Sequence, residues 1–258
     1  MKILQLLERL QQGRFLWLLM VFVTLGLTAV AHYFFQDYLY MQPCEQCVYI
    51  RFAMITMAIG GILAAVYPSN ATRIIGYILG FYGCLIGFGF CLKLDDIHTA
   101  VHAADAFGGV EGCRQIPVFP FALPLHEWSE GWFLPTGDCG LDNPVVPEDA
   151  YGSLSSIQEF FVGTEANDFE DGFYSEGWYL IPSLHFMNMA IACLLCFVCC
   201  FVSLLAMFAG FVSNKCKCVK VGALIVIVAV ATLYFVGNSM KASYIEKEAS
   251  QVAMVSVY

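Results

Sequence analysis

The sequence predicts an all-α integral membrane protein with a long extracytoplasmic loop. Hydrophobic residues make up 59% of the 258 residues and charged residues only 13%, which is too little polar surface to cover a soluble domain of this length. Several apolar runs also reach the roughly 17–25 residues that a helix needs to cross a hydrocarbon core of about 30 Å. The chain is therefore expected to lie in a membrane, with helices as its main elements.

Five apolar segments are expected to cross the membrane, at residues 15–35, 48–67, 74–92, 183–212 and 221–237. The first has a basic lead, as a signal peptide would, but no small-residue cleavage site follows it, so we interpret it as a retained anchor. The fourth is long enough to tilt or to extend beyond the bilayer. The fifth is near the minimum length for a span. The sequence thus predicts four spanning helices plus a fifth, shorter one.

Lysine and arginine residues in the short loops predict the orientation, because cytoplasmic loops carry an excess of them. They lie before the first segment, between the second and third, and after the fourth: Lys2, Arg9, Arg14, Arg73, Lys215, Lys217 and Lys220. We therefore predict a cytoplasmic N-terminus, outer loops at residues 36–47 and 93–182, and an outer tail at 238–258 if the fifth segment spans. The long outer loop holds 16 acids against Lys93 and Arg114, and this acidity argues against a nucleic-acid partner.

The predicted topology sorts the twelve cysteines. Four face the oxidising compartment in two plausible pairs, Cys44 with Cys47 and Cys113 with Cys139. The others lie in membrane segments or in a cytoplasmic loop: Cys84, Cys91, Cys193, Cys196, Cys199, Cys200, Cys216 and Cys218. We interpret the group at 193–200 as small apolar residues, because no histidine accompanies it and thiolates are costly at membrane depth. No metal is expected. The two cytoplasmic cysteines are expected to be reduced thiols, with palmitoylation as the alternative.

The stretch PCEQCVYIR at residues 43–51 places a C-x-x-C and an arginine at the start of the second segment. Such a pair can be a structural staple, half of a zinc site or a redox dithiol. A zinc site needs a second half of similar spacing, which neither Cys113 nor Cys139 provides, and a staple would close too small a ring to stabilise much. Redox chemistry remains. Cys47 suits it, because the free N–H groups and the dipole of a helix N-terminus favour a thiolate.

Arg51 follows Cys47 by four residues and therefore lies on the same face of the helix. Two interpretations stay open for an arginine on the outer side of a membrane helix. It can reach lipid phosphates from the interface, or it can be a fixed cation that stabilises a thiolate or the developing anion of an electron acceptor dissolved in the bilayer.

The segment between Cys113 and Cys139 reads CRQIPVFPFALPLHEWSEGWFLPTGDC. Leu125, Trp128, Trp132 and Phe133 repeat at helical spacing with polar residues between them. This pattern predicts a short amphipathic helix on the membrane surface, with prolines breaking the backbone on both sides.

The two motifs together resemble DsbB, the family of bacterial disulfide-generating quinone reductases. PCxxCxxxR at the second segment and C…FPxxLPLxxWxxxxFxxxGDC in the second outer loop carry this resemblance, which covers residues 13–139. It implies a DsbB-type four-helix bundle in the bacterial inner membrane, with both cysteine-bearing loops in the periplasm. We accordingly divide the chain into a redox core at 1–139, an acidic insert at 140–182, and a third part at 183–258 with helix four, the basic loop and helix five.

The resemblance also implies the activity of a protein-dithiol:quinone oxidoreductase. The soluble partner would be a thioredoxin-like thiol oxidase of the DsbA type, and the electron acceptor ubiquinone or menaquinone. Cys113 would form the mixed disulfide with the partner, Cys139 would exchange with Cys44, and Cys47 would contact the quinone with Arg51 beside it. A strong acceptor is needed, because DsbA is itself a strong oxidant at about −120 mV.

Three features depart from the DsbB pattern. Residues 140–176 form a longer acidic stretch, which we expect to be solvated and dispensable for quinone reduction; a fifth apolar segment follows the usual four; and Ile50 stands where an acid is frequent. The first two favour the DsbI branch, which serves a DsbL-like partner. His98 and His102 lie near where the family places polar residues close to the quinone. The alternative for each is an ordinary interfacial histidine.

Two other classes share part of the pattern. A tetraspanin-like scaffold without enzymatic activity also has four spans with a long second outer loop, but its Cys-Cys-Gly motif is reduced here to Asp138-Cys139-Gly140, and a scaffold gives no reason for C-x-x-C followed by arginine. An enzyme like vitamin K epoxide reductase shares C-x-x-C and quinone but places its cysteine pairs differently along the chain.

Overall fold

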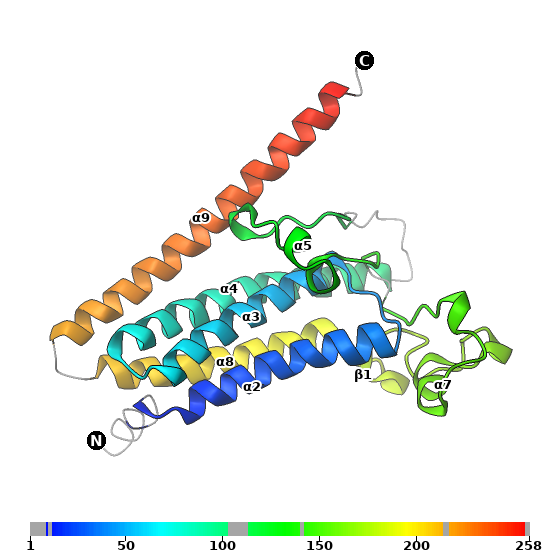
Figure 1. The fold of residues 1–258 in the computed structure, drawn as a ribbon, viewed down its shortest axis with the longest axis horizontal. Coiled ribbons are helices and arrows are strands. Elements are labelled where there is room, and N and C mark those ends of the chain that lie inside the picture. The colour runs from blue at the N-terminus through cyan, green and yellow to red at the C-terminus, as the bar shows by residue number, and fades with distance from the viewer. Residues whose placement is uncertain (1–8, 10–11, 103–112, 140–141, 214–216, 256–258) are drawn as a thin grey trace.

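The computed structural model describes residues 9, 12–102, 113–139, 142–213 and 217–255. Within these residues, five helices are long and apolar enough to cross a membrane. They are α2 (Phe15–Ala29) continued by the π-helix η1 (Val30–Tyr38), α3 (Glu45–Val66), α4 (Asn70–Val101), α8 (Met189–Val212) and α9 (Lys217–Val255). Figure 1 shows α2, α3, α4 and α8 side by side and α9 running obliquely to them. The predicted all-α membrane fold is confirmed.

The helices extend further than the apolar windows predicted. The first continues to Tyr38 and the third to Val101, so Lys93 and His98 lie in a helix and not in the outer loop. The fifth continues to Val255, so most of the predicted tail is helical. The reason is physical: hydropathy detects the stretch that matches lipid, whereas a helix can continue past it wherever its polar side chains find water or protein partners.

The fourth span begins at Met189 and not at residue 183. Asn188 caps it, since its Oδ1 accepts a hydrogen bond from the N–H of Ile191 at 2.9 Å. An asparagine cap stops the helix because its side chain replaces the missing backbone acceptor. The preceding residues form η5 (Pro182–Leu184) and β2 (Phe186–Asn188), which pairs antiparallel with β1 (Tyr179–Ile181).

Small residues let α3 and α4 approach closely. A side chain at Gly60 would lie 2.9 Å from Leu79 Cβ and 3.1 Å from Gly76 O, and one at Gly83 would lie 2.5 Å from Met57 Cγ. Membrane helices associate through such close packing, because lipid offers no hydrophobic drive between them. The pair forms the centre of the bundle, with α2 packed on α3 and both α8 and α9 packed on α4.

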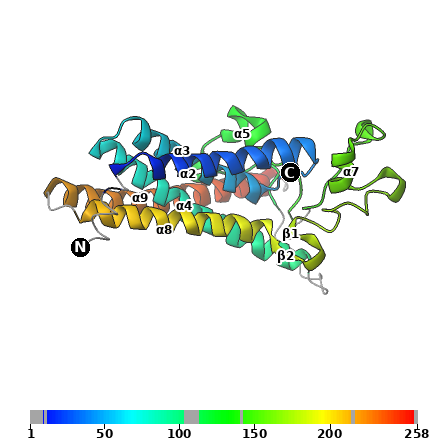
Figure 2. The same cartoon turned by 90° about the horizontal axis from the view of Figure 1, so that it is seen from below.

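The acidic insert folds against one end of the bundle. It contains η3 (Glu148–Ala150), α7 (Ser156–Val162) and η4 (Glu165–Asn167), and Figure 2 shows the α7 segment beyond the end of α2. Its apolar residues bury a separate core with two residues of the first outer loop: Val146, Ala150, Val162, Tyr174 and Trp178 with Leu39 and Met41. The expectation of a solvated segment is therefore wrong, because aromatic and aliphatic residues between the acids supply enough apolar surface for a core.

The predicted amphipathic helix is broken into two single turns, α5 (Leu125–Trp128) and α6 (Glu130–Phe133). Ser129 separates them with φ −156° and ψ 85°, outside the helical region. Trp128 is 68% exposed, as expected of a membrane anchor. Trp132 instead packs on the ring of His32, 4.2 Å between centroids, so part of the apolar face is used for contacts within the protein.

Candidate redox site

The first cysteine pair forms the N-terminal turn of α3. Cys44 is the N-cap residue with an extended backbone, and its Sγ accepts a hydrogen bond from the N–H of Cys47 at 3.4 Å. The two sulfurs lie 2.9 Å apart, which is the direct result of C-x-x-C spacing at a helix start. This sulfur–sulfur contact and burial raise the pKa of Cys44 well above the usual value of a thiol. Cys44 is thus the buried member of the pair, and Cys47 the more accessible one.

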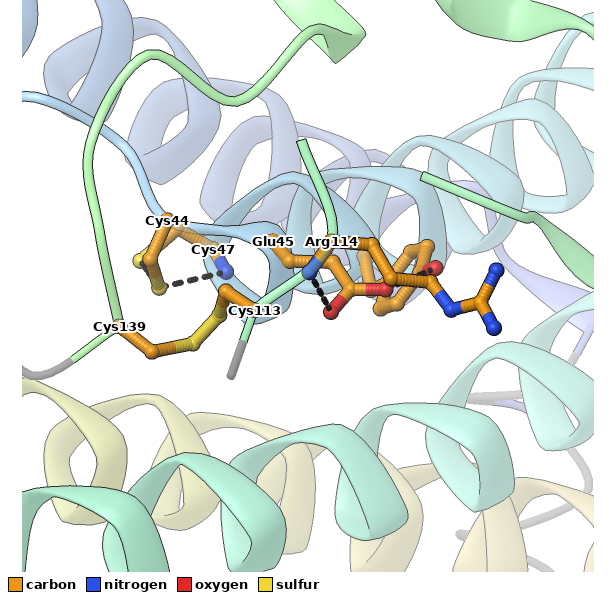
Figure 3. Close-up of a disulfide and its surroundings, with 7 residues drawn as sticks. Cys44, Glu45, Cys47, Cys113, Arg114 and Cys139 are labelled. Atoms are coloured by element: carbon orange, nitrogen blue, oxygen red, sulfur yellow. Dashed lines mark hydrogen bonds between the residues drawn. A yellow bond between two sulfur atoms is a disulfide. The ribbon is translucent and has the colours of Figure 1, made fainter. Parts of the chain in front are cut away.

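The second pair is joined as the disulfide Cys113–Cys139, with 5.4 Å between the Cα atoms, inside the usual range for such a bond. Cys113 and Cys139 pack against the same apolar cluster as Cys44 and Cys47. Figure 3 shows the disulfide beside the first turn of α3. The four cysteines predicted to be redox-active therefore meet in one place.

Buried polar contacts hold the segment that follows Cys113 (residues 114–122, the Cys113 arm) to α3. Glu45 Oε2 accepts a hydrogen bond from the N–H of Arg114 at 3.2 Å, and Glu45 Oε1 accepts one from the Tyr49 hydroxyl at 2.7 Å. The Tyr49 oxygen in turn accepts from the N–H of Val118 at 2.9 Å. Glu45 is 7% exposed, so these contacts form with little competition from water. They place the residue after Cys113 against the residue after Cys44.

The segment before Cys139 is held to the first outer loop, at the residue before Cys44. The carbonyl oxygen of Pro43 accepts hydrogen bonds from the N–H groups of Thr136 and Gly137, at 3.1 and 3.2 Å. A side chain at Gly137 would lie 2.7 Å from Gln42 O, so this approach requires glycine. Both ends of the loop that carries the second disulfide are thus fixed to the loop that carries the first pair.

Arg51 is buried, with 5% exposure. Its Nη1 donates to Gln36 Oε1 at 2.9 Å and to Trp132 O at 3.4 Å, and its Nη2 donates to Ala31 O at 3.5 Å. All three acceptors are neutral oxygens, so they orient the guanidinium without cancelling its charge. These contacts to η1 and α6 are those of a fixed internal cation; a side chain that reaches out to lipid phosphates would be exposed.

Gln36 connects three parts of the site. Besides accepting from Arg51, its Oε1 contacts His32 Nδ1 at 3.1 Å, and its Nε2 donates to Gly131 O at 3.4 Å. It lies in η1, where π-helical winding changes the register of α2 after Ala29. Such segments are rare and often occur at functional sites. Here the π-helix presents Gln36 to α3 and α6 together.

An apolar cavity of about 200 Å³ opens beside the first cysteine pair. Its polar lining includes Cys44, Cys47, Arg51, His98 and Asp142. The rest is largely apolar and comes from α2, α3, α4, α8 and the insert, with Leu27, Val30, Ile50, Met54, Leu94, Trp178 and Cys193 among the lining residues. Apolar walls with a few convergent polar groups are typical of a small-molecule site. Asp142 and Trp178 belong to the insert, so the insert forms one wall of the cavity.

His98 lines this cavity, and its neighbours determine which ring nitrogen carries the proton. Asn188 Oδ1 is occupied by the N–H of Ile191, so Asn188 Nδ2 faces His98 Nδ1 at 3.3 Å as a donor. Nδ1 must then accept, and in the neutral ring the proton is on Nε2. This N–H is buried and has no hydrogen-bond partner among the described residues, although Asp142 Oδ2 lies 3.4 Å away.

The hydrogen bonds of His98 do not suit metal binding. Within the described part of the chain, one group of metal-type ligands converges, formed by His98, His102 and Asp142. A histidine that binds metal through Nε2 donates its Nδ1–H to an acceptor, whereas His98 Nδ1 faces an amide donor. As arranged, His98 Nε2 and His102 Nε2 lie 3.4 and 3.5 Å from the two carboxylate oxygens of Asp142. No pattern in the sequence points to Asp142, which is distant in the chain from the two histidines.

Several of the other cysteines line cavities in the membrane part of the protein. Cys193 lines the cavity, while Cys196, Cys199 and Cys200 line a second apolar cavity between α2 and α8. Cys216 and the side chain of Cys218 lie outside the described part of the chain.

Residues that the sequence did not single out connect the site: Gln36, Glu45, Tyr49 and Asp142. Glu45 and Tyr49 lie inside the quoted stretch PCEQCVYIR. A glutamate in the first turn of a helix at the membrane boundary is a signal that could have identified one of them, because a buried carboxylate needs partners. Gln36 and Asp142 depend on contacts between distant segments and carry no such signal.

Comparison with known proteins agrees with this geometry. The family described as "Disulfide bond formation protein DsbB" matches residues 13–153. A DsbI protein of Campylobacter jejuni (strain RM1221) is 54% identical over 235 residues, covering 90% of this chain and 88% of the relative. A DsbI of Campylobacter fetus subsp. fetus (strain 82-40) is 56% identical over 200 residues, or 77% and 87%. The protein-disulfide oxidoreductase DsbI of Salmonella typhimurium (strain LT2) is 53% identical over 204 residues, or 78% and 87%.

These similarities show that a tetraspanin-like scaffold is the wrong interpretation and that the protein is an enzyme of disulfide formation. They also place it in the bacterial inner membrane, as a multi-pass protein. The chain belongs to the DsbB/DsbI family of protein-disulfide oxidoreductases.

Proposed function

We propose that this oxidoreductase re-oxidises a soluble periplasmic thioredoxin-like dithiol of the DsbA or DsbL type and passes the electrons to a membrane quinone, ubiquinone or menaquinone. The observation that carries the proposal is the joint anchoring of the two cysteine pairs. Both arms of the Cys113–Cys139 loop are hydrogen-bonded to the turn that carries Cys44 and Cys47, and that turn opens onto an apolar cavity.

The electrons travel by two net thiol–disulfide exchanges, each made of two thiolate attacks. A thiolate of the partner attacks Cys113 Sγ and releases the thiolate of Cys139. The partner's second thiolate then attacks the mixed disulfide, which oxidises the partner and frees Cys113. Cys139 attacks Cys44 Sγ of an oxidised Cys44–Cys47 pair and releases Cys47 as thiolate. Cys113 attacks Cys139, which re-forms the second disulfide and leaves the first pair reduced.

Re-oxidation of Cys44 and Cys47 transfers two electrons and two protons to the quinone, which leaves as quinol. The net reaction converts a partner dithiol and a quinone into a partner disulfide and a quinol. The cavity fits such a substrate, since a quinone has a polar carbonyl-bearing ring and an apolar tail. The apolar lining from α2 and α8 suits the tail, and the polar end at Cys47, Arg51 and His98 suits the ring.

Arg51 and His98 would act on the quinone head group in different ways. The guanidinium of Arg51 is held by neutral oxygens, so its full charge is available to stabilise the Cys47 thiolate and the negative charge that develops on the acceptor. His98 offers a buried N–H without a hydrogen-bond partner among the described residues, which is the kind of group that a ligand carbonyl satisfies.

The proposed orientation places the N-terminus in the cytoplasm and all four redox cysteines in the periplasm. It rests on the lysine and arginine pattern and is tested with a membrane-impermeant maleimide on reduced, intact spheroplasts. Label is expected on Cys47, Cys113 and Cys139, and on Cys44 as the pH is raised, but not on Cys216 or Cys218. Labelling of the last two from outside would contradict the orientation.

The proposed reaction is tested in proteoliposomes that contain ubiquinone or menaquinone, with reduced DsbA as the electron donor and quinone absorbance as the readout. Replacing any of the four redox cysteines by serine should abolish turnover, whereas Cys199→Ser, an exposed cysteine of α8, should leave it unchanged. The Cys139→Ser protein should also accumulate a mixed disulfide between DsbA and Cys113. Turnover by the Cys44→Ser or Cys47→Ser protein would refute the proposed route.

A further inference from the structure

Helix α9 contacts the arm that leads away from Cys113. Arg114 Nη1 donates to Glu248 Oε2 at 2.7 Å, in an ion pair whose side chains are 35% and 41% exposed. The same Arg114 donates its backbone N–H to the buried carboxylate of Glu45. One residue next to a redox cysteine is therefore bound on one side by α3 and on the other by α9.

A second contact lies about two turns earlier on α9. The Nζ of Lys241 lies 3.6 Å from the centroid of the Tyr49 ring and 5.4 Å from that of Phe90. A cation over a ring face is attracted to it, more strongly when both are removed from water. Tyr49 is the residue that donates to Glu45 and accepts from Val118, so Lys241 supports the same set of bonds that fixes the arm.

A third contact involves the backbone of the arm itself. Phe121 and Ala122 both have left-handed backbones, with φ of 62° and 52°, a conformation that non-glycine residues hold only where the surroundings enforce it. The ring of Phe121 packs against α9 so closely that a side chain at Gly237 would lie 3.1 Å from it, and also packs on Tyr82. The absence of a side chain at Gly237 thus makes room for the ring of Phe121, which lies in the left-handed turn.

We propose that α9 is a positioning element for exchange between the two cysteine pairs, with Glu248 and Lys241 as its positioning residues. The proposal rests on the reaction proposed above and goes beyond it, because α9 lies outside the part of the chain that the DsbB family match covers. The helix holds residues 114–122 against α3, and thereby keeps Cys139 and its disulfide within reach of Cys44. It takes no part in the bond changes themselves.

Charge complementarity supports this role. Glu45 is a buried carboxylate directly after Cys44, and a negative charge there opposes a thiolate in the same helical turn. Lys241 is a cation that α9 holds over the ring of Tyr49, whose hydroxyl donates to Glu45. Helix α9 therefore fixes the arm and also brings a positive charge to this turn.

The test separates positioning from quinone chemistry. In full-length protein with Cys47→Ser and Cys113→Ser, the remaining redox cysteines are Cys44 and Cys139, and their rate of disulfide formation with diamide reports how close the two loops lie. Glu248→Arg places two positive charges opposite each other, at positions 114 and 248. It should slow this rate about two- to tenfold. Exchanging the charges with Arg114→Glu and Glu248→Arg together should restore most of it. Glu246→Arg, an exposed site on the same helix, is the matched control.

A milder variant and the melting temperature distinguish a loss of positioning from a loss of folding. Glu248→Gln should give a smaller effect of the same sign, and the melting temperature of each variant identifies loss of folding. Equal rates of disulfide formation in all α9 variants would overturn the positioning role even if quinone turnover is normal. Absence of quinone turnover in the wild-type protein, with rapid formation of the Cys44–Cys139 bond, would instead overturn the proposed function and leave the role of α9 standing.

Discussion

Glu45 accepts the backbone N–H of Arg114 at 3.2 Å, and this single bond joins the residue after Cys44 to the residue after Cys113. The two residues are 69 positions apart in the chain. Because Glu45 is buried and also accepts from Tyr49, it acts as a fixed point on α3 to which the second redox loop is attached. The relationship explains how a proline-rich loop reaches the C-x-x-C turn in a defined orientation.

Replacing Glu45 by alanine should loosen the second loop. The change leaves the N–H of Arg114 and the Tyr49 hydroxyl without their acceptor, which costs about 1–3 kcal/mol for a buried group. We expect lower thermal stability and slower electron transfer from the second pair to the first. Glu45→Gln keeps one amide oxygen and should retain part of both. Glu127→Gln, at a side chain that is 69% exposed, is the control, and wild-type rates in Glu45→Ala would contradict the anchoring role.

Replacing Arg51 by alanine should reduce quinone reduction strongly. A charge-assisted contact worth about 1.5–3 kcal/mol corresponds to a loss of roughly 10- to 150-fold, since each 1.36 kcal/mol is tenfold in rate. Arg51→Lys should recover only part, because an ammonium cannot span Gln36, Ala31 and Trp132 as the planar guanidinium does. Single-turnover oxidation of the partner at Cys113 should be nearly unchanged in both. If both variants reduce quinone at wild-type rates, the proposed quinone site is wrong.

His98→Phe should raise the KM for quinone by up to about tenfold, because it removes a polar group from the lining of the cavity. His98→Gln retains a donor and should have a smaller effect. The measurement is steady-state quinone reduction over a range of quinone contents in the bilayer. His185→Phe, in the exposed hairpin between β1 and β2, serves as the control. An unchanged KM for His98→Phe would remove His98 from the site.

Deleting residues 143–171 should weaken quinone binding. The deletion removes Val146, Ala150 and Val162 from the core that covers Leu39 and Met41, and Met41 lines the cavity. We expect a lower melting temperature and a higher KM for quinone, and this replaces the expectation from composition that the insert is dispensable. Replacing the exposed Glu165 and Glu170 by glutamine should change neither. A folded deletion variant with normal quinone KM would show that the insert does not shape the cavity.

Alkylation of the reduced protein should select Cys47 over Cys44 at neutral pH. Reagents such as iodoacetamide attack thiolates, and the contact with Cys47 together with burial raises the pKa of Cys44. Cys44 therefore stays protonated at neutral pH, and its share of the label should rise as the pH is increased toward its raised pKa. Mass spectrometry of the labelled peptide distinguishes the two sites. Equal labelling of both at neutral pH would contradict the assignment of Cys44 as the protonated member.

The sequence by itself determined the class of the protein and the arrangement of three residues, Cys44, Cys47 and Arg51, at the start of α3. Hydrophobic runs of sufficient length require spanning helices in any folded form, because the membrane leaves them few alternatives. The spacing of Cys44 and Cys47 before a helix determines their contact, because an N-cap residue and the residue three positions on are neighbours in any helix start. Arg51 on the same face follows from helix geometry for the same reason.

The tertiary structure alone decided what surrounds these residues. Where the helices end, the break at Ser129 and the π-helical winding that presents Gln36 depend on packing between segments, which no local pattern encodes. The expectation that the insert is solvated was wrong because its composition is dominated by a run of acids. The burial of its apolar residues, such as Val162 and Trp178, depends on Leu39 and Met41, which are far away in the chain. The contact of Glu248 with Arg114 likewise joins residues 134 positions apart, and a pairing at that distance is decided by the path of α9 across the bundle.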